Sequence, residues 1–89
     1  MRSLDDLKNI LIEMGYEDTV LFENPDYLSA ITGISDTGRL IYSYEKMVEH
    51  LMKEDEMEEE DAIEFIDYNT IRALPYMGDN APIINYDIF

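Results

Sequence analysis

The chain has 89 residues, and its 21 Asp and Glu against six Lys and Arg give a formal net charge of −15 at pH 7. This length predicts a single domain over residues 1–89, and the 46% of hydrophobic residues is enough to exclude a disordered chain. The charge disfavours direct binding of nucleic acid or an anionic membrane. With no Cys and no long apolar segment at the N-terminus, we expect a cytoplasmic protein without disulfides or thiolate metal sites.

The first half of the chain predicts one helix and one hairpin. Ser3 is a suitable N-cap for a helix in SLDDLKNILIEMG, and Gly15 ends the run. The apolar side of this helix consists of Leu4, Leu7, Leu11 and Met14. The segment YLSAITGISDTGRLIYS is typical of two strands around a turn, in which Gly38 takes the positive φ of a short hairpin loop.

Two further helices and a strand are predicted in the second half. Ser43 caps YEKMVEHLMKE, and a third helix runs from about Glu58 to Leu74. The buried side of the third helix is expected to consist of Ala62, Phe65, Ile66, Asn69 and Ala73. Asn69 would then bind backbone groups near the helix end, and Pro75 would end the helix because it has no N–H. We expect Arg72 to form a structural ion pair.

These elements predict an α+β fold. We expect a small, mostly antiparallel sheet of three or four strands, packed on one face by about three helices. The final segment, APIINYDIF, has the β-branched content of a last strand that returns to the sheet after both later helices. Most of the seven tyrosines are interpreted as core or core-edge residues, because the chain contains no Trp and only three Phe.

The second half of the chain also contains features that carry a resemblance. The matching features are Tyr44 with Met47 and Val48, the block AIEFIDYNTIRALPYMG, and the closing APII. On these residues the segment from 40 to 84 resembles a family of small acidic proteins from Gram-positive bacteria and their mobile elements. Such proteins often have Ser or Thr before the third helix, where this chain has Glu58. The resemblance implies no particular activity.

The segment KEDEMEEEDAIEFID is the most acidic part of the sequence. Four of its carboxylates recur at helical spacing and would stack along one side of a helix: Glu56, Glu60, Glu64 and Asp67. The alternative is a face that is only solvated. We predict a partner-binding surface for a basic protein, such as a nucleic-acid-processing effector. Its residues are Glu56, Glu58, Glu59, Glu60, Asp61, Glu64 and Asp67.

The sequence predicts neither a metal site, a cofactor nor catalysis. No calcium-binding loop is present, and His50 with Glu54 supplies only half of a transition-metal site. The single His has no Ser or Cys nucleophile in its sequence context. Two function classes therefore remain. One is an acidic inhibitor that occupies a basic nucleic-acid-binding surface, as anti-restriction and anti-CRISPR proteins do. The other is a housekeeping interaction module that uses the surface from Tyr68 to Gly78.

Overall fold

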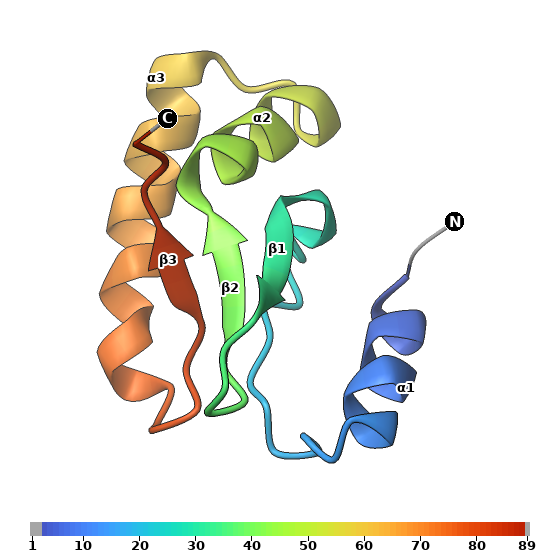
Figure 1. Cartoon of the computed structure of the whole chain (residues 1–89). Coiled ribbons are helices and arrows are strands. Elements are labelled where there is room, and N and C mark those ends of the chain that lie inside the picture. The colour runs from blue at the N-terminus through green and yellow to red at the C-terminus, as the bar shows by residue number, and fades with distance from the viewer. Residues whose placement is uncertain (1–2, 89) are drawn as a thin grey trace.

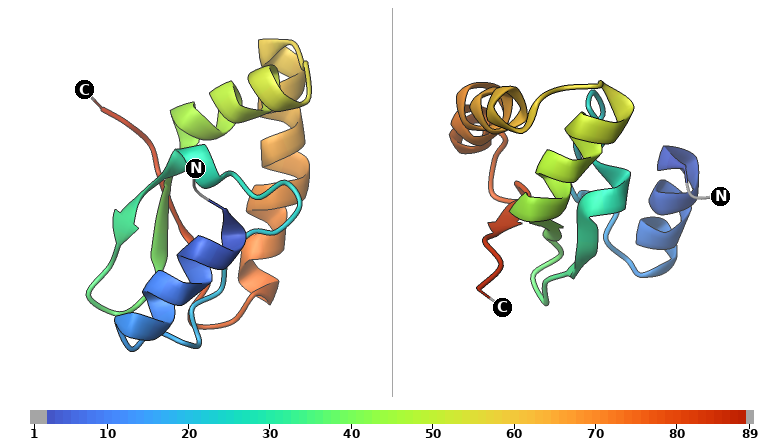
Figure 2. Two further views of the ribbon diagram at one scale, coloured as in Figure 1. Left: turned by 90° about the vertical axis from the view of Figure 1, so that its right-hand side faces the viewer. Right: turned by 90° about the horizontal axis from the view of Figure 1, so that it is seen from above.

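The protein folds as a three-stranded sheet with helices, shown in Figure 1 as a computed structural model that describes residues 3–88. The elements are α1 (Leu4–Glu13), η1 (Leu28–Ala30), β1 (Ile31–Ile34), β2 (Leu40–Ser43), α2 (Tyr44–Glu54), α3 (Glu59–Phe65), η2 (Ile66–Ile71), η3 (Leu74–Tyr76) and β3 (Ile83–Asn85). The α+β class and the three-stranded sheet are confirmed. In the side view of Figure 2, α3 and η2 form one continuous helical segment on one side of the sheet.

The sheet is mixed rather than mostly antiparallel. Its strand order is β1-β2-β3, with β1 antiparallel to β2 and β3 parallel to β2. The hairpin between β1 and β2 has Gly38 at φ +81°, as the sequence predicts. A fourth strand is not formed within residues 3–88, since the apolar segment 20–22 lies outside the sheet. The β3 strand is parallel because the chain crosses back through α2, α3 and η2 before it enters the sheet.

The predicted N-caps of the first two helices are confirmed. The Ser3 side chain accepts a hydrogen bond from the backbone N–H of Asp6 at 3.2 Å, and the Ser43 side chain accepts one from Lys46 at 3.3 Å. In α1, Leu11 is buried as expected, but Met14 is 51% exposed. Met14 follows the last residue of the helix, so it does not extend the buried side of α1.

The core lies between β2, the α2 and α3 helices and the loop that precedes η1. Its buried members are Leu11, Phe22, Tyr27, Ala30, Leu40, Tyr42, Met47, Val48, Leu51, Ala62 and Ile66. The Phe22 ring packs edge-on against Tyr27, with centroids 5.5 Å apart, and at a tilt against Tyr42, with centroids 4.8 Å apart. The expectation that most tyrosines are core or core-edge residues is confirmed, since Tyr27 and Tyr42 are buried and Tyr16 and Tyr44 pack against the core. The other three, Tyr68, Tyr76 and Tyr86, are exposed.

The third helix differs from its prediction in the face that it buries. The α-helical part gives way to the π-helix η2, and the buried side is Ala62, Ile66 and Thr70. Asn69, predicted to face the core, is exposed and donates a hydrogen bond to the Phe65 carbonyl at 3.2 Å. The reason is geometric. A π-helix has more residues in each turn than an α-helix, so the buried position that follows Ile66 moves from residue 69 to Thr70.

Two further expectations for this segment need correction. Arg72 forms no ion pair with any residue from 3 to 88; its guanidinium carbon lies 5.3 Å from the centroid of the Tyr68 ring. Pro75 does not end the helix at Leu74, because it is accommodated in one more turn, η3. A proline fits the first turn of a helix, where its missing N–H is not needed.

Candidate functional site

The structure places all seven predicted partner-binding carboxylates on the surface: Glu56, Glu58, Glu59, Glu60, Asp61, Glu64 and Asp67 are exposed. Glu56, however, lies in the loop before α3 with φ +54°, so it does not belong to the predicted helical stack. The other six lie on α3, on η2 or next to them, and we call them the acidic face. Glu60 and Glu64 are one helical turn apart and share one side of α3.

The charges of the acidic face are not neutralised by cations of the same chain. Within residues 3–88, Lys8 forms an ion pair with Glu23 at 3.6 Å, and His50 lies 3.7 Å from Asp26, a contact that is an ion pair only when the imidazole is protonated. Neither pair includes a carboxylate of the acidic face. The negative potential of this surface is therefore available to an external partner.

Asp67 differs from the other carboxylates of the acidic face because a side chain positions it. It accepts a hydrogen bond from the Tyr44 hydroxyl at 3.0 Å. Burial and the neighbouring Asp67 carboxylate raise the pKa of Tyr44 to about 12, so this hydroxyl keeps its proton and remains a donor at neutral pH. The bond holds the end of the acidic face against α2.

An open groove of about 480 Å³ runs beside the acidic face. It is lined by Met57, Asp61, Glu64, Phe65, Tyr68 and Asn69. The carboxylates were predicted from the sequence, but the apolar members of the groove were missed. The spacing of Asp61, Phe65 and Tyr68, four and three residues apart, is the signal that could have found one shared side.

A second arrangement that the sequence analysis missed surrounds His50. The Ser29 Oγ lies 3.0 Å from Nδ1 of His50, and Asp26 Oδ1 lies 3.7 Å from Nε2. The sequence context of His50 does not reveal this contact, because Ser29 comes from η1, 21 residues away. Asp26 also accepts a hydrogen bond from the Leu28 N–H at 3.1 Å. These contacts connect η1 to α2, beside a cavity of about 470 Å³.

The Ser29, His50 and Asp26 arrangement lacks the geometry of a catalytic triad. The 3.7 Å separation of His50 from Asp26 is longer than a hydrogen bond, so the carboxylate does not fix the tautomer of the imidazole. In the part of the chain from Ser3 to Ile88, no group of three or more His, Asp or Glu side chains is placed to hold a metal ion. The contacts support a structural role for His50.

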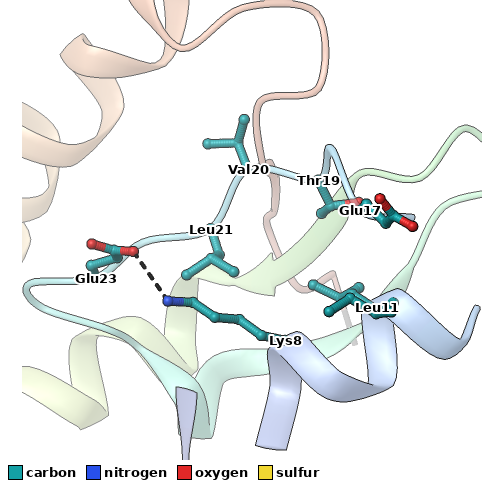
Figure 3. A pocket seen from close by; sticks show the side chains of 8 residues that line it. Lys8, Leu11, Glu17, Thr19, Val20, Leu21 and Glu23 are labelled. Atoms are coloured by element: carbon teal, nitrogen blue, oxygen red, sulfur yellow. Dashed lines mark ion pairs between the residues drawn. The ribbon is translucent and has the colours of Figure 1, made fainter. Parts of the chain in front are cut away.

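A further cavity, of about 410 Å³, lies between α1 and the loop after it, as Figure 3 shows. Its charged side chains include Lys8 and Glu23, which form an ion pair across the cavity. Because Lys8 is paired with Glu23, the charge of this cavity is partly balanced within the chain. The groove beside the acidic face contains two carboxylates and no cation.

Comparison of the chain with protein-family models, with curated protein sequences and with solved structures gives no significant match. None of the helices within residues 3–88 has the length and apolar character needed to span a membrane.

Proposed function

We propose that this protein is a non-catalytic acidic binding protein that occupies a basic, nucleic-acid-binding surface of another protein. One observation carries the proposal. The acidic face is exposed, and no cation of the described chain forms an ion pair with it. Leaving so many like charges close together destabilises a small domain, and a basic partner would offset this repulsion. The sequence resemblance to proteins of mobile elements favours an inhibitor of the anti-restriction or anti-CRISPR type.

The acidic face would act as a coarse imitation of a phosphate row. Side chains three or four residues apart on a helix are about 5–6 Å apart, whereas phosphates along one DNA strand are spaced by about 3.4 Å along the axis. The match is therefore electrostatic rather than atomic. Such complementarity mainly accelerates association and makes it sensitive to salt.

Charge reversal on the acidic face tests this proposal. The variant Glu60→Lys with Glu64→Lys should slow association with a basic partner isolated from a bacterial lysate and weaken the salt dependence of the rate. A matched control, Glu13→Lys with Glu17→Lys, makes the same change in net charge near α1, on the other side of the molecule (Figure 1). Duplex DNA should compete with the parent protein for the partner.

Two results would contradict the proposal. One is a partner that binds the reversed variant as fast as the parent at physiological salt. The other is a loss of binding that is equal in the variant and in the α1 control, because net charge alone would then explain it. Circular dichroism spectra that match the parent should accompany both measurements, since all four positions are exposed.

A second candidate is an interaction module that uses the surface from Tyr68 to Gly78. Tyr68 and Tyr76 favour this second candidate, because these residues are 61% and 90% exposed and tyrosine is enriched in interfaces. Binding through this surface would change little with salt. Tyr76→Ala would abolish it, whereas reversal of Glu60 and Glu64 would not.

A further inference from the structure

The groove beside the acidic face combines carboxylates with apolar side chains. Asp61 and Glu64 are exposed, whereas Met57 and Phe65 are half-buried and pack against the core. The Tyr68 ring is 61% exposed and lines the same groove. A ligand that matches this groove therefore combines a positive charge with apolar surface.

The change from α-helix to π-helix brings these groups to one side. Asp61, Glu64 and Phe65 belong to α3, and Tyr68 and Asn69 belong to η2. The wider turn of η2 directs Thr70 inward, which leaves Tyr68 and Asn69 on the outer side with the carboxylates. The groove thus depends on the same local geometry that the fold uses to bury Thr70.

The chain itself shows that the Tyr68 ring accepts a guanidinium group. The guanidinium carbon of Arg72 lies 5.3 Å from the centroid of this ring, within the range of a cation–π contact. Even with Arg72 in place, most of the Tyr68 side chain is accessible to solvent. Tyr68 also lines the groove together with Asp61 and Glu64, whose carboxylates would balance the charge of a second cation there.

We infer that this groove receives an arginine side chain of the basic partner, in preference to lysine. The inference rests on the proposed function and specifies its recognition chemistry. The methylene stem of an arginine would pack along Met57 and Phe65, and its planar guanidinium would stack on Tyr68. The guanidinium can also form paired hydrogen bonds to a carboxylate, which the ammonium group of lysine cannot match in geometry.

Oligo-arginine and oligo-lysine peptides of equal length and charge provide the test. Their dissociation constants are measured by calorimetry at about 0.15 M salt, where exposed charges are screened beyond about 8 Å. We expect the arginine peptide to bind the parent about threefold to tenfold more tightly. Because arginine binds carboxylates well on many surfaces, the decisive quantity is how this ratio changes among variants.

The variants separate the ring from the charges. Tyr68→Leu should reduce the arginine-to-lysine ratio while the lysine affinity stays nearly constant, and Tyr68→Phe should keep the ratio because it keeps an aromatic face. Asp61→Asn with Glu64→Gln should weaken arginine binding more than lysine binding. The matched control Glu13→Gln with Glu17→Gln should weaken both peptides equally and leave the ratio unchanged.

The results distinguish this inference from the proposed function. If the ratio is the same in the parent and in Tyr68→Leu while both peptides still bind, the groove does not select arginine, and the inference is overturned although the acidic face still binds cations. If neither peptide binds the parent and the Glu60→Lys, Glu64→Lys variant retains its partner, both proposals fail. Loss of the ratio in Tyr68→Leu, with retention in Tyr68→Phe, supports the inference.

Discussion

The interior and the acidic face use polar groups in opposite ways. In the interior, the Tyr27 hydroxyl lies 2.9 Å from Thr70 Oγ1, the Phe22 N–H donates to the Tyr42 hydroxyl at 3.3 Å, and Ser43 donates to Asp87 at 2.6 Å. No buried side-chain N or O atom of residues 3–88 lacks a hydrogen-bond partner. The carboxylates of the acidic face have no cationic partner in the same part of the chain.

This difference separates what maintains the fold from what is available for binding. A buried hydroxyl without a partner costs stability, so each interior polar group is matched inside the fold. Apart from Asp67, which accepts a hydrogen bond from Tyr44, the exposed carboxylates of the acidic face are satisfied by water, and the fold does not require them. Changes in the interior should therefore affect stability, and changes on the acidic face should affect binding. Three measurements test this difference between the interior and the acidic face.

Alkaline pH should produce the largest effect, through the interior tyrosines. Burial raises the pKa of Tyr42 from 10.0 to about 12, and burial also raises the pKa of Tyr27. Between these pH values the unfolded chain loses the Tyr42 proton while the folded chain keeps it. The contribution of Tyr42 to the free energy of unfolding should be unchanged below pH 10 and should then fall by about 1.4 kcal/mol per pH unit, or about 3 kcal/mol up to pH 12. Tyr27 and Tyr44, whose pKa values are also raised, add to this loss.

Urea unfolding across this pH range measures the loss. Tyr42→Phe should reduce the dependence on pH, whereas Tyr76→Phe should leave it unchanged, because the Tyr76 side chain is 90% exposed. A profile that is flat from pH 10 to 12 in the parent would contradict the burial of Tyr42.

Thr70 and Asn69 are neighbours in the sequence, but Thr70 is buried in the interior and Asn69 is exposed on the surface. Thr70→Val keeps the shape of the side chain but leaves the buried Tyr27 hydroxyl without a partner, so it should cost about 1–3 kcal/mol. Asn69→Ala removes a hydrogen bond to the Phe65 carbonyl from an exposed position and should cost less than about 1 kcal/mol. Thermal melts of both variants measure the difference. Equal costs would mean that the π-helix does not separate the two residues as described.

The sequence predicted the features that depend on neighbouring residues. The caps Ser3 and Ser43 and the turn at Gly38 follow from residue type and spacing, and the structure confirms them. Asn69 was misplaced because an α-helical period was assumed across a π-helix, which no sequence period reveals. The contact of Ser29 with His50 joins residues 21 apart and depends on the tertiary fold.

The candidate site was predicted in the same uneven way. Exposure of the carboxylates follows from composition and spacing, and all seven residues are on the surface. Glu56 does not belong to the helical stack, because the chain turns at this residue with a positive φ. A positive φ is uncommon for Glu, so the sequence gives no sign of this turn. The groove was missed because Met57 and Tyr68 become neighbours only through the path of the loop into α3 and through the wider turn of η2.

Salt should produce the smallest effect, and the acidic face should account for a measurable part of it. Added NaCl screens the repulsion among its carboxylates, so the melting temperature at pH 7 should rise, with a gain in stability below about 1 kcal/mol. Interior hydrogen bonds respond little to ionic strength. Glu60→Gln with Glu64→Gln should therefore raise the melting temperature at low salt and reduce the further gain from salt. Thr70→Val should lower the melting temperature without changing that gain. If the salt response is the same in the Gln variant and in the parent, the repulsion arises from other carboxylates of the chain. A basic partner would then have no repulsion to relieve on the acidic face.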